Sequence, residues 1–262
     1  DMLLCGLVNL GANRSKIIDG IRSAESLCNG VKVKKIDFVE VKKNSLHATE
    51  LLLEIDGDAH ERKGTEVKEI IEKSVEKLQI TEKAKIFAVN TVKTLIRAES
   101  KIHSEPEESV HFHEAAGFDT VVDILGTAIA LDDLGCFDDQ IVVTPVALGG
   151  GTVTFSHGVS SNPTYAVLEI FRGSGIITAG GNVKDELTTP TGASILVNLA
   201  KECSEFYPPM KIQSVGYGAG QKDFEEFSNV LKIVRGVLST QLQLDTVQIL
   251  ETNVDDVSGE VL

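Results

Sequence analysis

Residues 31–55, VKVKKIDFVEVKKNSLHATELLLEI, contain two apolar runs on either side of a polar tetrapeptide. The run at 31–41 is rich in valine, isoleucine and phenylalanine, as strands are, and the run at 46–55 resembles a partner strand. The tetrapeptide Lys-Lys-Asn-Ser between them has the composition of a turn. We therefore predict a β-hairpin, with a bulge between Val33 and Ile36, where the apolar phase shifts.

Helical spacing of apolar residues predicts helices on both sides of this hairpin. Gly11 ends the first of them, Thr65 is an expected N-cap, Thr81 opens the next helix, and Gly135 closes the last. A Glu-Pro-Glu-Glu segment at 105–108 separates the last two helices. The helices are expected at residues 2–10, 15–27, 65–78, 81–103 and 118–134.

The second half of the chain has glycine-rich segments at residues 149–151, 180–181 and 216–220. Further helices are predicted at 163–171 and 190–201. Strands are predicted at residues 141–144, 153–155, 212–217, 230–237 and 247–250. The predicted fold class is α+β, a mixed α/β architecture with a β-hairpin and helices in the first half and a glycine-rich mixed sheet with helices in the second.

Composition limits the classes of function. The chain has 262 residues, of which 42% are hydrophobic and 24% are charged, and its formal net charge is −14. This acidity argues against nucleic acid and anionic membranes as partners, because both require basic patches. The four cysteines lack C-x-x-C spacing and no apolar run reaches about 18 residues, so we expect a cytoplasmic protein with reduced thiols.

Residues 111–114, His-Phe-His-Glu, concentrate polar groups in an apolar neighbourhood. In extended backbone, the side chains of His111 and His113 point to the same face, because the side-chain period of a strand is two. Asp119 and Asp123 follow at i and i+4 on the next predicted helix. Imidazole and carboxylate together form a ligand set that suits zinc, iron or nickel.

Two interpretations of this segment remain open from spacing alone. In one, Asp119, Asp123 and Thr127 form a solvated helix face, and the histidines lie at the entry to the helix. In the other, the segment is a metal or acid–base site at the N-terminus of the helix. A similar choice applies to His157, which lies next to a glycine and is either structural or directed into a pocket.

Two further segments are candidates for binding an anionic ligand. Thr189 and Pro190 suit the N-cap and first position of a helix, where free N–H groups favour a phosphate; a plain capped helix is the alternative. Residues 216–220, Gly-Tyr-Gly-Ala-Gly, allow close approach of a ligand, but an acidic loop and a strand follow, rather than the helix of a dinucleotide site. No Walker motif or serine-hydrolase elbow occurs.

An ordered set of short motifs runs along essentially the whole chain, at residues 1–4, 111–114, 119, 122–124, 144–145, 148–151, 157–158, 189–193, 216–220, 229–231 and 251–256. Each motif alone is weak, whereas the ordered set is highly specific. With these motifs the chain resembles the LarC family of nickel-insertion proteins. Members of that family insert nickel into pyridinium-3,5-bisthiocarboxylic acid mononucleotide to form the nickel-pincer nucleotide cofactor, and they use CTP with a divalent cation, Mg or Mn.

The resemblance implies a lyase-type enzyme, a nickel chelatase or cyclometallase, whose substrate is a small-molecule nucleotide. Imidazole and carboxylate ligands suit nickel delivery, because thiolates would compete with the sulfur atoms of the substrate. We therefore expect nickel ligands at His111, His113 and Asp119. A base must remove the proton of the pyridinium ring, and Glu114, His113 or Asp123 is expected to serve. The expected catalytic residues are Glu114, Asp123 and His157. The expected nucleotide-binding residues are Thr189, Thr191, Gly192, Gly216, Gly218 and Gly220.

Some features depart from the family pattern. The usual histidine-rich run is reduced to His60 and Arg62. We expect residues 1–250 to form the nickel-insertion domain, as one unit or as lobes at 1–137 and 138–250. Residues 251–262 would begin a truncated CTP-binding domain, so the fragment alone is expected to lack CTP binding and could be inactive. The alternatives are a non-catalytic nickel metallochaperone module and an inactive structural protein, and a homo-oligomer stays open.

Overall fold

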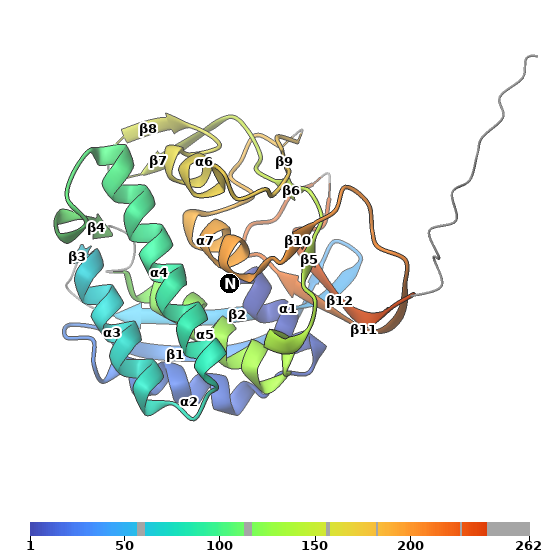
Figure 1. Cartoon of the computed structure of the whole chain (residues 1–262), viewed down its shortest axis with the longest axis horizontal. Helices are drawn as coiled ribbons and strands as arrows, with labels where there is room; N and C mark the ends of the chain where they lie inside the picture. Colours follow the sequence, from blue (N-terminus) through green and yellow to red (C-terminus); the bar gives the residue numbers. More distant parts are fainter. Residues whose placement is uncertain (57–60, 113–116, 156–157, 182, 226, 240–262) are drawn as a thin grey trace, which may run out of the picture.

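The computed structural model describes residues 1–56, 61–112, 117–155, 158–181, 183–225 and 227–239 (Figure 1). The first half contains α1 (Met2–Leu10), α2 (Arg14–Glu25), β1 (Lys32–Lys43), β2 (Leu46–Asp56), β3 (Arg62–Lys63), α3 (Gly64–Lys77), α4 (Glu82–His103), β4 (His111–Phe112) and α5 (Phe118–Asp133). The second half contains β5 (Val142–Val143), β6 (Val146–Ala147), β7 (Thr152–Phe155), β8 (Gly158–Ser161), α6 (Tyr165–Phe171), β9 (Thr178–Ala179), α7 (Pro190–Leu199), β10 (Glu202–Cys203), β11 (Met210–Ala219) and β12 (Val230–Leu238). This mixture confirms the α+β class.

Strands β1 and β2 form the predicted hairpin. They pair antiparallel along their length, and the register shifts between Val33 and Lys35, which confirms the bulge. Phe38 and Leu51 lie opposite each other, and both are buried. They mark the face of the hairpin on which the helices pack, because side chains alternate between the two faces of a strand.

Strands from the other half of the chain complete this sheet. Its strand order is β1–β2–β11–β12; β11 and β12 are antiparallel, and β11 runs parallel to β2 at the pair Gly218 and Thr49. The sheet therefore joins segments from both sides of residue 137, where the sequence suggests a boundary between lobes. The predicted strand at 247–250 lies outside the described residues.

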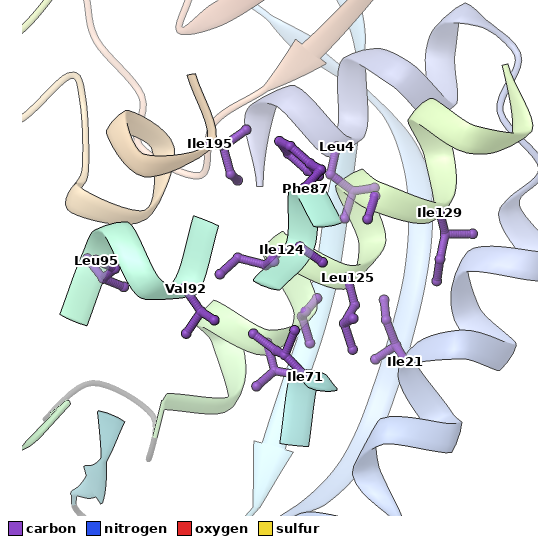
Figure 2. Packing of buried hydrophobic residues seen from close by; sticks show 14 of the residues in the cluster. Leu4, Ile21, Ile71, Phe87, Val92, Leu95, Ile124, Leu125, Ile129 and Ile195 are labelled. Atoms are coloured by element: carbon purple, nitrogen blue, oxygen red, sulfur yellow. The ribbon is translucent and has the colours of Figure 1, made fainter. Parts of the chain in front are cut away.

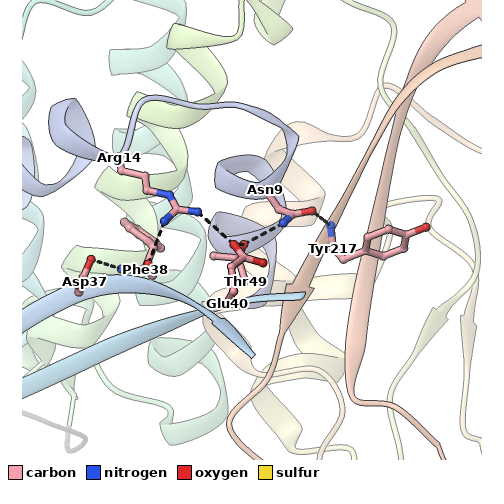
Figure 3. Close-up of polar contacts among 7 residues, drawn as sticks. All are labelled: Asn9, Arg14, Asp37, Phe38, Glu40, Thr49 and Tyr217. Carbon is pink, nitrogen blue, oxygen red and sulfur yellow. Dashed lines mark hydrogen bonds and ion pairs between the residues drawn. The ribbon is translucent and has the colours of Figure 1, made fainter. Parts of the chain in front are cut away.

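Helix α1 is tied to the sheet by a chain of polar contacts (Figure 3). Asn9 accepts a hydrogen bond from Tyr217 N at 2.9 Å and donates one to Thr49 Oγ1 at 2.9 Å. Thr49 donates to Glu40 Oε1 at 2.9 Å, and Arg14 of α2 donates to the same oxygen at 3.1 Å. Since Glu40 and Thr49 are paired across the hairpin, α1 and α2 cover the same face of the sheet.

Helix α5 is the centre of the hydrophobic core. It packs against α1, α2, α3 and α4, and Figure 2 shows its Ile124 among side chains of the neighbouring helices. From Phe118 to Leu131, every residue is buried except Asp119 and Asp123. A helix that is apolar nearly all round belongs in a core. These two half-buried carboxylates are therefore exceptions that need a reason other than solvation of a helix face.

The ends of the helices test the predicted caps. Thr81, where the sequence predicts that a helix opens, accepts a hydrogen bond from Ala84 N at 3.4 Å and is the N-cap of α4. The cap predicted at Thr65 is wrong, because α3 already begins at Gly64. The Gly64 N–H donates to Val110 O at 2.8 Å, so the pairing of β3 with β4 determines where this helix starts.

The rest of the second half packs beside the helices of the first. Helices α6 and α7 contact α4, and short strands form the two-stranded sheets β5–β10, β6–β9 and β7–β8. The predicted helix at 163–171 starts later, at Tyr165, after Pro163. None of the described helices is both long and apolar enough to cross a membrane.

Candidate metal and nucleotide site

His111 lies in extended backbone, as the H-x-H interpretation requires. It is the first residue of β4, it pairs with Lys63 of β3, and its side chain is half-buried. Phe112, next to it, is buried and points to the opposite side of the strand. His113 and Glu114 lie outside the described residues, so their predicted roles as ligand and base stay predictions.

Gly117 connects this strand to the N-terminus of α5. Its φ of 70° is in the left-handed region that glycine adopts without strain. A Cβ here would lie 2.9 Å from Val67 Cγ2 and 3.6 Å from Phe112 Cβ, so the chain is packed tightly between α3 and β4. The first turn of α5, which carries Asp119, is thereby held next to the strand of His111.

Asp119 lies in the first turn of α5, where a carboxylate is favoured by the free N–H groups of the helix. Its Oδ1 accepts from Thr120 N at 2.8 Å. Thr127 lies two turns further along and is 1% exposed, and its hydroxyl has no hydrogen-bond partner among the described residues. The interpretation of Asp119, Asp123 and Thr127 as a solvated face is therefore wrong at Thr127.

Asp123 contacts the start of α1. Its Oδ1 lies 2.8 Å from the backbone nitrogen of Asp1, and its side chain is 21% exposed. On the other side of α1, the carbonyl oxygen of Met2 lies against Gly218, and the Met2 sulfur would lie 3.0 Å from a Cβ at Gly220. The fold thus places Asp123 and the glycine-rich strand β11 on two sides of the same helix start.

The glycines of β11 have a packing role. A Cβ at Gly216 would collide with the Gly6 carbonyl oxygen, and a Cβ at Gly218 would collide with the carbonyl oxygen of Met2. Gly220 lies against the side chain of Asn229. The close approach that the sequence suggests is therefore made by α1 on this side of the strand, and a ligand role for these glycines stays a prediction.

The thiol of Cys5, on α1, is not available as a thiolate at neutral pH. Burial, with the carboxylates of Asp123 and Glu50 acting in the same direction, raises the pKa of the Cys5 thiol to about 12. Burial also raises the pKa values of Cys28 and Cys136. Since a thiol must lose its proton to bind a metal, these side chains are poor ligands at neutral pH.

The structure at the start of α7 confirms the predicted cap at Thr189. The same hydrogen bonds leave few backbone N–H donors there for a phosphate. Thr189 Oγ1 accepts from Gly192 N at 3.1 Å, and Ala193 N donates to Thr189 O at 2.9 Å. Pro190 has no N–H. Of the first helical donors, the N–H of Thr191 is left for a ligand, together with the half-buried Thr191 hydroxyl.

The sequence did not reveal the residue that organises the segment before α7. Asn162, which is 8% exposed, donates to Leu148 O at 3.1 Å and to Asp185 O at 2.8 Å. It thereby fixes the glycine loop at 149–151 against the segment that leads to Thr189. A polar residue directly before a predicted helix is too common a signal to have identified it.

No group of three or more His, Cys, Asp or Glu side chains within the described ranges is arranged to hold a metal ion. The predicted ligand His113 and the predicted catalytic residues Glu114 and His157 are outside those ranges. Asp123 and Gly218 flank the start of α1, and Asp119 lies near β4.

Comparison with known proteins identifies the family of this chain. The model of the family described as "Nickel insertion protein" matches residues 1–262. The chain belongs to this family. It is 38% identical over 264 residues to a putative nickel insertion protein of Methanothermobacter thermautotrophicus, covering 100% of this chain and 61% of that protein. No solved structure shows a significant match.

A second group of relatives carries a more specific name. The chain is 34% identical over 262 residues to the pyridinium-3,5-bisthiocarboxylic acid mononucleotide nickel insertion protein of Staphylococcus epidermidis, covering 100% of this chain and 62% of that protein. A protein of the same name from Staphylococcus saprophyticus is 33% identical over 263 residues, with 100% and 63% covered. The chain therefore spans less than two thirds of the length of each of these relatives.

Proposed function

We propose that the protein containing this chain inserts nickel into pyridinium-3,5-bisthiocarboxylic acid mononucleotide and so forms the nickel-pincer nucleotide cofactor. The observation that carries the proposal is family membership along all 262 residues, together with the substrate named for the two staphylococcal relatives. Because the chain spans under two thirds of these relatives, the activity is proposed for the whole protein, as a nickel chelatase or cyclometallase of the lyase class.

Nickel is the cargo of this reaction, so its ligands must bind the ion and then release it to sulfur. We assign this role to His111, His113 and Asp119. The extended backbone at His111 and the half-buried carboxylate of Asp119 support the assignment, as does the tight packing of Gly117 between them. Protonated thiols at the buried cysteines leave imidazole and carboxylate as the better donors.

The proposed reaction also needs a base for the proton on the ring carbon that nickel replaces. We assign this role to Asp123, with Glu114 and His157 as the other candidates. Asp123 is supported by its place: it is half-buried on a helix that is otherwise apolar, and it lies beside the helix start that faces β11. Partial burial keeps a carboxylate reachable for substrate while limiting its solvation.

For the nucleotide phosphate we propose the start of α7. Thr191 is the main donor in this proposal, because the Thr189 hydroxyl already accepts from Gly192 N and Pro190 lacks an N–H. The helix dipole adds a favourable field for an anion there. Gly216, Gly218 and Gly220 are assigned a smaller part, since their side of β11 packs against α1 and Asn229.

Use of CTP with Mg or Mn, and a cytoplasmic location, are proposed for the whole protein on the family resemblance alone. The domain that would bind CTP begins at about residue 251, which lies outside the described residues. A non-catalytic nickel metallochaperone is the alternative that shares the same metal ligands. It differs by having no need of the substrate, the base or CTP.

The test is an assay of the full-length protein with the bisthiocarboxylate nucleotide, nickel and CTP, in which the nickel-containing product is detected by mass spectrometry. Product that depends on all three components supports the proposal. Nickel binding without product would favour the metallochaperone. An Asp123→Asn variant that still binds nickel and substrate but forms no product would place the base at Asp123, and unchanged turnover would move that role to Glu114 or His157.

A further inference from the structure

An ion pair connects the loop after β11 with the segment that leads to α7. The Lys222 ammonium lies 2.5 Å from Asp185 Oδ1, and the two side chains are 56% and 31% exposed. The hydrogen bond from Lys222 lowers the pKa of the Asp185 carboxyl, so this group is a carboxylate at neutral pH. The two residues are 37 positions apart in the chain, so the contact belongs to the tertiary structure and not to a local turn.

On the α7 side, Asp185 lies in a segment that is fixed by hydrogen bonds. Its backbone oxygen accepts from Asn162 Nδ2 at 2.8 Å. Thr188 Oγ1 donates to Ala147 O at 2.7 Å, directly before Thr189, the cap of α7. Because the segment is held at both ends, the position of Asp185 is coupled to the position of the helix start.

On the β11 side, Lys222 lies two residues after Gly220. Asn229 ties the two residues together, since its Nδ2 donates to Lys222 O at 3.0 Å and its carbonyl oxygen accepts from Gly220 N at 3.0 Å. A Cβ at Gly220 would lie 3.0 Å from the Met2 sulfur, so this loop begins next to the start of α1. Asp123 contacts the same helix start.

These contacts form a continuous connection between two parts of the proposed site. One part is the start of α1 with Asp123 and β11, and the other is the start of α7 with Thr191. The two parts pack on different neighbours, because α7 lies against α4, α5 and α6, whereas β11 lies against α1, β2 and β12. The pair of Lys222 and Asp185 is thus a direct side-chain contact between them.

We propose that the ion pair of Lys222 and Asp185 positions the start of α7 relative to β11 and α1 for binding of the mononucleotide. The inference rests on the proposed function, because it takes the phosphate to bind at α7 and the ring to lie beside Asp123. A ligand that contacts two parts binds more tightly when they are already held in the bound arrangement, because less conformational freedom is lost on binding. Lys222 and Asp185 are therefore positioning residues, which act through the parts that they connect.

A different role for Lys222 would be to attract the anionic substrate by its charge alone. The two roles predict opposite effects of removing the charge of Asp185. If the pair positions the site, the loss of either partner weakens binding. If charge alone matters, the loss of the negative charge at Asp185 strengthens binding of an anion, whereas the loss of the positive charge at Lys222 weakens it.

Isothermal titration of the full-length protein with pyridinium-3-carboxylic acid mononucleotide tests the inference. This probe shares the pyridinium ring and the nucleotide phosphate of the proposed substrate but lacks its sulfur atoms, so binding is measured without nickel chemistry. Lys222→Met and Asp185→Asn should each raise the Kd about fivefold. The double variant should raise it no further than either single variant, because one broken pair accounts for both losses.

Two further measurements separate positioning from a general loss of structure. Lys222→Arg should keep the Kd within about twofold of the unaltered protein, because arginine can also pair with the Asp185 carboxylate. The midpoint of thermal unfolding should shift by less than about 3 °C in each variant, since partly exposed ion pairs contribute little to stability.

Lys83→Met is the matched control. Lys83 of α4 pairs with Asp138 in the turn after α5, and these side chains are 61% and 79% exposed. The substitution breaks an ion pair of the same kind near the C-terminal end of α5, whereas Asp123 lies near its N-terminal end. The Kd for the probe should therefore stay unchanged in Lys83→Met.

Tighter binding in Asp185→Asn would overturn the inference, because Lys222 would then act by its charge. An unchanged Kd in Lys222→Met, losses that add in the double variant, an equal loss in Lys83→Met, or no binding of the probe to the unaltered protein would also overturn it. The nickel-insertion assay is judged separately. Product formation with a Kd that is unaffected by Lys222→Met rejects the positioning role alone, whereas probe binding that depends on the pair, without any product, rejects the proposed function alone.

Discussion

Asn9 and Tyr217 are joined by a hydrogen bond of 2.9 Å, from the backbone N–H of Tyr217 to the side-chain oxygen of Asn9. This contact fixes the first helix to a strand 208 residues later in the chain. The same amide donates to Thr49 on the hairpin. One polar side chain on α1 thus connects the two parts of the sheet.

We expect Asn9→Ala to lower the free energy of unfolding by about 1–3 kcal/mol, because it leaves the Tyr217 N–H without its acceptor and removes the donor to the buried Thr49 hydroxyl. Chemical denaturation measures this change. Asn90→Ala is the control, since Asn90 is exposed and its side chain has no partner among the described residues, and it should alter stability by less than about 0.5 kcal/mol. Equal effects would show that Asn9 does not connect the sheet.

Gly218→Ala should destabilise the chain by about 1–3 kcal/mol or more, because the added methyl group would collide with the carbonyl oxygen of Met2. Gly180→Ala is the control, since open space surrounds a Cβ at Gly180. Thermal unfolding distinguishes them. If Gly218→Ala folds with unchanged stability but loses substrate affinity, the glycine serves the ligand and not the packing of α1.

The buried Cys5 thiol should make the free energy of unfolding decrease as pH rises. Its pKa is about 12 in the folded protein against 9.0 when unperturbed, so the unfolded chain loses this proton first. The stabilisation is complete below pH 9 and decreases by about 1.4 kcal/mol per pH unit as pH rises towards 12. Cys5→Ala should flatten this part of the pH profile, measured by chemical denaturation at several pH values, and an unaltered slope would contradict this role of Cys5.

His111→Ala should weaken nickel binding about tenfold or more if the imidazole is a direct ligand. His47→Ala is the control, because His47 is exposed on β2 and belongs to no predicted ligand set. Isothermal titration with nickel ions measures both. Equal affinities in the two variants would remove His111 from the metal site.

Substitutions of Thr189 and Thr191, at the start of α7, should have different effects: one on stability and the other on substrate binding. Thr189→Ala removes the cap on Gly192 N and should cost about 1 kcal/mol of stability, while Thr189→Ser should restore it. Thr191→Ala should leave stability nearly unchanged and weaken binding of the mononucleotide substrate. Unaltered substrate affinity in Thr191→Ala would contradict the proposed phosphate site.

Local sequence patterns predicted most of the elements. The hairpin and its bulge follow from composition and apolar phase, the start of α4 near Thr81 follows from apolar spacing, and the Thr189 cap follows from the chemistry of capping. The Thr65 cap failed because strand pairing, through Gly64 N and Val110 O, determined the start of α3. That pairing involves residues more than 40 positions apart, to which local capping rules do not apply.

The candidate site was predictable in part. The ligand interpretation of the H-x-H segment requires the extended backbone that His111 has, and spacing placed Asp119 and Asp123 on one helix face. Spacing could not show that the helix is buried around these carboxylates, nor that Asp123 meets the start of α1. Neither could it show that Asn162 links the glycine loop to the segment before α7.

The sequence by itself determined the mixture of helices and strands and, through its ordered motifs, the family. These properties depend on interactions between near neighbours and on the identity of residues in order. The tertiary structure alone decided that β11 and β12 join the first hairpin in one sheet, and that Gly216 and Gly218 pack against α1. Such contacts form between segments about 200 residues apart, so the steric fit of one backbone against another determines them and local patterns do not.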